Sequence, residues 1–373
     1  MCIRDRPNDL GAVFTDKSRT MPRARLGSGS WQLEDDALAR LRDKIVGGRK
    51  TLGEVYGAPL YGIKTGLNEA FIIDTPTRDR LVKQDKKSAE LLKPFLKGED
   101  IKRWRVEPEG LFLINTPKGK VDIEKYPAIR DWLLPFKTDL EKRATKQEWW
   151  ELQQAQLAYQ PQFATGKIIY GHFADERIFT FEKDGFLSND KSYFIPNATF
   201  DLLALLNSKV AWSFIKSISP AVRGGFHELR VQYVEKLPIP KIDPKSRLML
   251  VKLAQGSTEA AKQRIEVQSG FRHRVINDLA PPDRQKLTGK LESFWTLDFA
   301  AFRAEVTRAF KNEIPVKDRD GWEKYLAEKS AEVVKLTAEI EASEREIDAV
   351  VYKLFDLTPD EVKLLEDSLE GQH

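Results

Sequence analysis

The stretch that organises this chain is residues 62–74, with the sequence GIKTGLNEAFIID. Two glycines enclose Lys64 and Thr65, and Asn68 then leads into an apolar, β-favouring run. Glycines allow a tight turn that presents backbone N–H groups, an ammonium and a hydroxyl to one ligand. Such a turn is able to hold a phosphate, and a lysine can also reach a guanine edge. An ordinary loop before a core strand is the alternative.

The composition is that of a folded protein with a mild positive charge. The 373 residues are 41% hydrophobic and 32% charged, with a formal net charge of +4, which is compatible with nucleic acid but does not require it. Cys2 is the single cysteine, so an internal disulfide and a cysteine-based zinc site are excluded, and we expect a reducing, cytoplasmic location. The sequence contains no apolar run long enough to span a membrane.

The first seven residues, MCIRDRP, resemble a translated sequencing-adapter remnant. We therefore expect native sequence to begin near Asn8 and the chain to be the C-terminal part of a longer protein. A genuine N-terminus is the alternative. Residues 8–30 are polar, basic and glycine-containing, which is typical of a linker.

The pattern predicts an α+β fold, with a mixed α/β region followed by a helical region. After a helix at residues 31–46, apolar runs and helical spacing alternate. We expect strands at residues 70–74, 111–115, 167–172, 177–181 and 192–195. We expect helices at residues 77–84, 88–95, 123–130, 137–143, 199–207 and 210–218.

The C-terminal region reads as a pair of long helices. The segment Leu237-Pro-Ile-Pro240 forces an extended chain, so we place a boundary there. Residues 248–275 have helical spacing, and a sevenfold apolar repeat marks a coiled-coil-like seam at Leu326, Val333, Ile340, Ile347 and Leu354. We expect these helices to pair antiparallel within the chain, with a homodimeric coiled coil as the alternative. Thr358 to Glu361 predicts the capped start of a last helix.

Cationic side chains beside aromatic residues or glycines mark further candidate binding positions. Arg103 with Trp104 suits a phosphate contact beside a stacked anchor, although Trp104 could equally be a core residue. Lys191 follows a polar turn, and Lys216 precedes Arg223, whose two following glycines allow close approach to a ligand.

Motifs for covalent chemistry are absent from the sequence. It contains no phosphate-binding GxxxxGK[ST] loop, no HExxH zinc motif and no GxSxG elbow. It also lacks an Asn-Pro-Pro-Tyr or Asn-Pro-Pro-Phe motif for a flipped adenine and a glycine-rich loop for S-adenosylmethionine. We therefore predict no catalytic, cofactor-binding or metal-binding residues in this chain.

Taken together, these stretches resemble the TaqI-like C-terminal specificity domain. This is the target-recognition region of type IIG restriction–modification enzymes and related adenine-specific DNA methyltransferases, including those of BREX-type phage defence. The resemblance runs over about residues 31–365 and rests on the order and spacing of individually weak motifs. They are GIKTGLNEAFIID (62–74), LLKPFLKGEDIKRW (91–104), KIIY (167–170), YFIP (193–196), LLALLNSKV (202–210), RGG (223–225), YVEKLPIP (233–240) and EIDAVVYKLFDLTPDEV (346–362).

The resemblance implies three parts in this chain. They are a truncated N-terminal remnant at residues 1–30, a target-recognition DNA-binding domain at 31–240 and a C-terminal helical domain at 241–373. It also implies a parent enzyme whose N-terminal methyltransferase domain uses S-adenosylmethionine to methylate adenine N6, with an additional endonuclease activity as an open alternative. This chain would then be a monomeric module that selects a site on double-stranded DNA for a catalyst supplied in cis.

The residues themselves provide candidate DNA contacts, because turns on a rigid scaffold can reach a groove. The candidates are Lys64, Thr65, Asn68, Arg103, Trp104, Lys191, Lys216 and Arg223. An interaction or scaffold protein that dimerises through its C-terminal helices is the alternative function.

Overall fold

The computed structural model describes residues 35–370 of the chain. Residues 1–34, which include the predicted remnant and the first residues of the predicted helix 31–46, lie outside this range. Chain contacts define two compact units, residues 1–47 and 48–373. The described part of the first unit is helix α2 (Asp36–Val46), where Asp35 accepts a hydrogen bond from the N–H of Ala37 and Gly47 ends the helix in a left-handed conformation.

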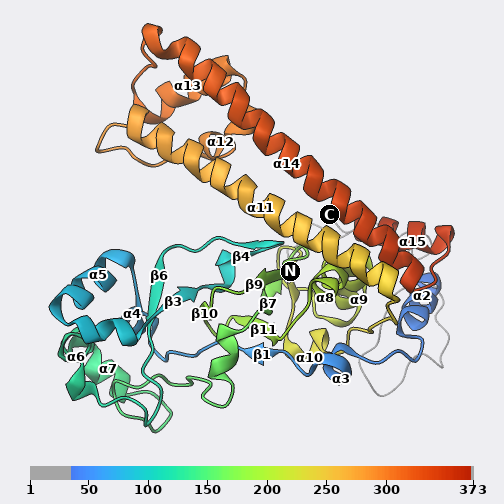
Figure 1. Cartoon of the computed structure of the whole chain (residues 1–373), viewed down its shortest axis with the longest axis horizontal. Coiled ribbons are helices and arrows are strands. Elements are labelled where there is room, and N and C mark those ends of the chain that lie inside the picture. Colours follow the sequence, from blue (N-terminus) through green and yellow to red (C-terminus); the bar gives the residue numbers. More distant parts are fainter. Residues whose placement is uncertain (1–34, 371–373) are drawn as a thin grey trace, which may run out of the picture. The chain divides into compact units, whose positions relative to one another are not determined.

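The second unit contains two four-stranded sheets and two short strand pairs (Figure 1). One sheet is antiparallel in the order β1-β11-β7-β9, and its central strand β7 is buried along its whole length. The strands are β1 (Leu60–Tyr61), β7 (Lys167–Gly171), β9 (Thr180–Glu182) and β11 (Ser192–Pro196). Because β7 is buried on both faces, its sequence is a continuous apolar run after Lys167.

The second sheet is mixed, in the order β10-β3-β6-β2. Strand β10 runs parallel to β3, while β3 with β6 and β6 with β2 are antiparallel. One core joins the two sheets: it contains Phe95 of β3 in this sheet, Phe194 of β11 in the first sheet and Phe163 of the 3-10 turn Gln160–Ala164. The strands are β2 (Ile72–Ile73), β3 (Leu92–Leu96), β6 (Leu111–Ile114) and β10 (Leu187–Ser188), and the separate pairs are β4 (Ile101–Lys102) with β5 (Arg105–Val106) and β8 (Phe173–Ala174) with β12 (His227–Glu228).

Short helices surround the sheets, and two sequence predictions are wrong here. Residues 88–95 were predicted as a helix, but the chain forms a 3-10 turn (Lys86–Glu90) and then strand β3. In the predicted strand 70–74, residues 70–71 end the helical turn α4, and only Ile72–Ile73 form a strand, β2. The helices are α3 (Leu52–Tyr56), α4 (Asn68–Phe71), α5 (Thr75–Gln84), α6 (Pro127–Leu133), α7 (Lys137–Glu141), α8 (Phe200–Leu206), α9 (Lys209–Ile218) and α10 (Val231–Val234).

The C-terminal region is an antiparallel pair of 36-residue helices, α11 (Pro244–Leu279) and α14 (Arg319–Leu354) (Figure 1). Arg264 on α11 donates to the Thr337 hydroxyl at 3.1 Å, and Phe271 packs edge-on against Trp322. Larger numbers on one helix therefore meet smaller numbers on the other. The seam residues Leu326, Val333, Ile340 and Ile347 are buried, which confirms pairing within the chain.

The ends of this helix pair are closed in different ways. Helices α12 (Gly289–Glu292) and α13 (Phe299–Phe310) fill one end with an aromatic cluster, in which Phe271 and Phe294 stack at 3.8 Å between ring centroids. At the other end, α15 (Pro359–Glu370) starts with the predicted capping box, because Thr358 and Glu361 exchange backbone-to-side-chain hydrogen bonds. Between residues 35 and 370, no helix combines the length and apolar character that a bilayer crossing requires.

The first sheet contains a buried ion pair that we expect to determine its stability. Lys167 is fully buried on β7, and its ammonium contacts both the Glu182 carboxylate and the Phe163 carbonyl. Burial lowers the pKa of Lys167, and the attraction of Glu182 opposes that shift. Replacing one partner leaves an uncompensated buried charge, which is strongly unfavourable.

We predict that Lys167→Met lowers the free energy of unfolding by about 3–5 kcal/mol. The double variant Lys167→Met/Glu182→Gln should recover at least half of that loss, because neither charge then remains in the interior. Urea unfolding followed by circular dichroism measures both. A loss below about 1 kcal/mol in the single variant would show that the carboxylate tolerates isolation.

Candidate nucleic-acid interface

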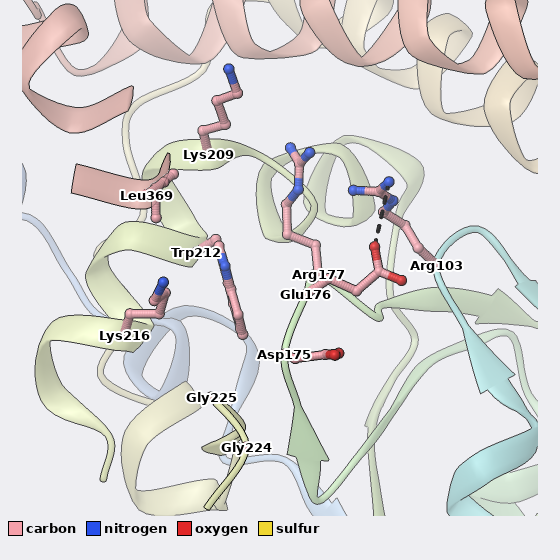
Figure 2. Close-up of a pocket in the computed structure, with 10 residues that line it drawn as sticks. All are labelled: Arg103, Asp175, Glu176, Arg177, Lys209, Trp212, Lys216, Gly224, Gly225 and Leu369. Carbon is pink, nitrogen blue, oxygen red and sulfur yellow. Dashed lines mark ion pairs between the residues drawn. The ribbon is translucent and has the colours of Figure 1, made fainter. Parts of the chain in front are cut away.

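A pocket of about 740 Å³ lies where the β4–β5 turn, the segment after β8, helix α9 and the loop after α9 come together (Figure 2). Its charged lining contains four cations and two carboxylates, and Trp212 contributes an aromatic wall. The lining residues are Arg103, Asp175, Glu176, Arg177, Lys209, Trp212, Lys216, Gly224, Gly225 and Leu369. Residues more than a hundred positions apart in sequence therefore share one surface.

Two carboxylates of helix α14 hold the arginines of this pocket. The Glu344 Oε1 atom lies 3.0 Å from Arg103 Nε, and the Asp348 Oδ2 atom lies 3.6 Å from Arg177 Nη1. Glu344 and Asp348 are four residues apart and thus project from the same face of the helix. Burial raises the pKa of Asp348, and the nearby Arg177 counteracts this effect.

The structure places Trp104 in the interior instead of at a binding surface. Its side chain is 1% exposed, and its Nε1–H donates to Glu344 Oε1 at 2.6 Å. The φ of 69° at Trp104 is rare for a bulky residue and turns the chain sharply between β4 and β5. The core alternative therefore describes Trp104, and the predicted stacking on DNA is not available to it in this structure.

The two lysines of α9 differ in their partners. The Lys209 ammonium donates to Glu366 Oε1 on α15 at 2.7 Å, and its backbone N–H donates to Asp348 Oδ1 at 2.7 Å. Lys216 is half-buried, and no carboxylate among residues 35–370 pairs with it. Burial lowers the pKa of Lys216. Because no described carboxylate pairs with it, the Lys216 ammonium is available to an anion or to an acceptor atom of a ligand.

Arg223 is at the tip of a tight loop beside the pocket. The Val222 N–H donates to the Phe226 carbonyl at 2.7 Å and closes the loop. Gly224 and Gly225 have φ values of 86° and 80°, which a side chain would make unfavourable. The loop therefore exposes Arg223 while bringing bare backbone to the pocket wall. The nearby His227 is buried and contacts Ser219 Oγ at 3.1 Å, in agreement with a structural role.

The turn around Lys64 and Thr65 requires a glycine at position 62 for steric reasons. A Cβ at Gly62 would lie 1.8 Å from the Asn189 carbonyl oxygen, so the two backbones pack too closely for any side chain. Thr65 is 3% exposed and its hydroxyl donates to Asn68 Oδ1 at 2.6 Å. These contacts match the alternative of a packed loop, while the Lys64 side chain remains exposed.

The eight predicted contact residues thus fall into separate places. Arg103 and Lys216 line the pocket, and Arg223 adjoins it through Gly224. Lys191, exposed on the turn between β10 and β11, and the residues of the 62–68 stretch are not part of its lining. The structure shows where all of them lie, and their roles in binding stay predictions.

Sequence reasoning missed the acidic and basic partners that complete the pocket. The charged triplet Asp175-Glu176-Arg177 between two short strands was a visible signal. Glu344 and Asp348 gave none, because several other acidic residues of α14 lie close to them in sequence. Between residues 35 and 370, no three His, Cys, Asp or Glu side chains converge as a metal site would require.

Two family models match separate segments of this chain. Residues 93–239 match the family model of the TaqI-like C-terminal specificity domain, and residues 243–351 match a domain of unknown function (DUF8810). The former segment contains the pocket's Arg103, Lys216 and glycine loop. The family match confirms the resemblance to the TaqI-like C-terminal specificity domain over residues 93–239, a narrower range than the expected 31–365.

Two individual proteins are similar to this chain. The type II methyltransferase M.PaeR7I of Pseudomonas aeruginosa is 27% identical over 248 residues, a match that covers 63% of this chain and 40% of the relative. The type IIL restriction–modification enzyme MmeI, solved in complex with DNA, is 12% identical with a TM-score of 0.48. That match covers 87% of this chain and 36% of MmeI. The chain therefore spans well under half the length of both proteins.

We predict that Glu344→Ala lowers the free energy of unfolding by about 1–3 kcal/mol, because it leaves the buried Trp104 indole N–H without its acceptor. Arg103 also loses its closest carboxylate. Glu341→Ala, one turn earlier on the exposed side of α14, is the matched control and should change stability by less than about 0.5 kcal/mol. Equal effects of the two substitutions in chemical denaturation would contradict a special role for Glu344.

Proposed function

We propose that this chain recognises a specific sequence in double-stranded DNA as the specificity part of a bacterial restriction–modification enzyme. The observation that carries the proposal is the convergence of Arg103, Lys216 and the Arg223 loop on one pocket inside the matched specificity domain. Arg103, Lys216 and Arg223 are three of the eight candidate contacts that the sequence predicted. Their proximity is what a surface that contacts one ligand requires.

The chemistry of the pocket suits a groove of duplex DNA. Cations contact phosphates and orient the protein, whereas sequence is read through donors and acceptors at base edges. The pocket lining has both kinds of group, because it combines ammonium and guanidinium donors with carboxylate acceptors. Ion pairs with α14 fix the arginines in advance, which reduces the entropy lost on binding.

We further propose that the parent enzyme methylates adenine N6 with S-adenosylmethionine through a methyltransferase domain outside this chain. Support comes from the methyltransferase name of the M.PaeR7I relative and from the larger length of that protein. We also propose a cytoplasmic location, which the single cysteine of the sequence supports, and a monomeric module.

We predict that the purified chain binds duplex DNA and that the logarithm of its affinity falls linearly with the logarithm of salt concentration. Arg103→Ala and Arg223→Ala should each weaken binding by about 1–3 kcal/mol if they contact bases. Because Arg103 also pairs with Glu344, its variant must first be shown to unfold at a near-normal denaturant concentration. Fluorescence anisotropy with a labelled duplex measures the affinities.

Lys317→Ala provides a control for the loss of one positive charge. Lys317 is exposed in the 3-10 turn Val316–Asp318, at the end of the helix pair opposite to α15. The Lys317→Ala substitution should change the affinity for duplex DNA by less than twofold if binding is localised at the pocket. Normal affinity in both arginine variants would refute the assignment of the pocket to DNA.

We also predict that the chain alone transfers no methyl group from radiolabelled S-adenosylmethionine to DNA. The reason is that its sequence lacks the Asn-Pro-Pro-Tyr/Phe motif and the cofactor loop that this transfer uses. Transfer above the level of a heat-inactivated sample, retained through a further purification step, would disprove the division of labour between this chain and a separate catalytic domain.

A further inference from the structure

Asp175 is one of the two acidic residues that line the pocket together with four cations (Figure 2). It follows strand β8 directly and is exposed. Within residues 35–370, its carboxylate has no ion-pair or hydrogen-bond partner, although Arg103, Arg177, Lys209 and Lys216 line the same pocket. A carboxylate that stays unpaired beside cations is available to a ligand.

The neighbours of Asp175 are held on both sides. Ala174 pairs with His227 in the β8–β12 ladder, and the next residue, Glu176, lies 3.6 Å from Arg103. Arg177 then donates to the Asn207 carbonyl at 2.9 Å and contacts the α14 carboxylates. The backbone is therefore fixed before and after Asp175, and its side chain is presented from a rigid support.

An unpaired carboxylate at a DNA-binding surface is unfavourable unless it receives a hydrogen bond. Phosphate oxygens offer only acceptors and repel it, by about 1 kcal/mol at 4 Å in water and more where water is excluded. Base edges differ, because cytosine N4 and adenine N6 are donors in the major groove. Asp and Glu side chains accept hydrogen bonds from cytosine N4 in particular.

We propose that Asp175 is a specificity-determining residue that accepts a hydrogen bond from the exocyclic amino group of one base, cytosine or adenine, in the DNA site. Lys216 and Arg223, on the same rim, contact acceptor atoms next to that base. The glycines at positions 224 and 225 let the duplex approach closely, since they place no side chain there. This inference rests on the proposed function and names the feature of DNA that the pocket reads.

The role of Asp175 has a signature that a structural residue would lack. Its removal should strengthen binding to unrelated duplex by roughly two- to tenfold, because a repulsive charge is lost. Discrimination at one base pair should at the same time fall by about 5- to 150-fold, the range for one good base contact. Removal of a residue that only shapes the loop would not raise the affinity for unrelated duplex while lowering the discrimination at one base pair.

The test begins by selecting the preferred sequence of the wild-type chain from a randomised duplex library. Asp175→Ala and Asp175→Asn then bind a panel in which each base pair of that sequence is replaced. Asp175→Ala should lose discrimination at one position, while Asp175→Asn loses the charge but keeps an acceptor oxygen and retains part of the discrimination. Asp283→Ala, an exposed acid between α11 and α12, is the control and should match the wild type.

The outcomes separate this inference from the proposed function. A wild-type chain that selects no sequence overturns both. A selective wild-type chain whose preference is unchanged in Asp175→Ala overturns only the role of Asp175. Loss of discrimination spread over all positions, accompanied by a lower denaturation midpoint, would indicate a damaged fold and would also refute a single-base role, with Asp175→Asn as the less disruptive check.

Discussion

The hydrogen bond between the Trp104 indole and Glu344 is the contact on which the arrangement of the site depends. It joins the β4–β5 turn to helix α14 across 240 sequence positions, and both partners are buried. The same carboxylate pairs with Arg103, and Asp348 one turn later pairs with Arg177. A buried carboxylate is tolerated only when its charge and its lone pairs are satisfied. The helical region therefore contributes to the pocket, because it supplies the carboxylates that hold Arg103 and Arg177.

This arrangement leaves few charged groups free for a ligand. Arg103, Arg177 and Lys209 all have carboxylate partners, so the excess of cations along the lining overstates its positive potential. Lys216 and Asp175 stand apart, since neither has an ion-pair partner among the described residues. A ligand with both acceptors and donors complements such a pair better than a phosphate alone, and a base edge in the major groove is such a ligand.

Local sequence predicted secondary structure correctly wherever a residue's neighbours in sequence determine its conformation. The seam of α14, the capping box at Thr358 and the buried strand β7 follow directly from periodicity and cap chemistry. The segment 88–95 shows the limit, because LLKPF carries leucines that suit a helix or a strand. The segment becomes a strand because β3 pairs with both β6 and β10, and β10 comes from a distant part of the chain.

The sequence by itself indicated the specificity-domain resemblance that the family match confirms for residues 93–239, the α+β class, two long C-terminal helices and a set of cationic candidates that includes Arg103, Lys216 and Arg223. Only the tertiary structure decided which candidates share a pocket, that Trp104 is interior and that Asp175 stands beside them unpaired. The physical reason is that charge pairing and burial are set by contacts between distant segments. A charged side chain looks the same in sequence whether its partner is water, a carboxylate on α14 or a ligand.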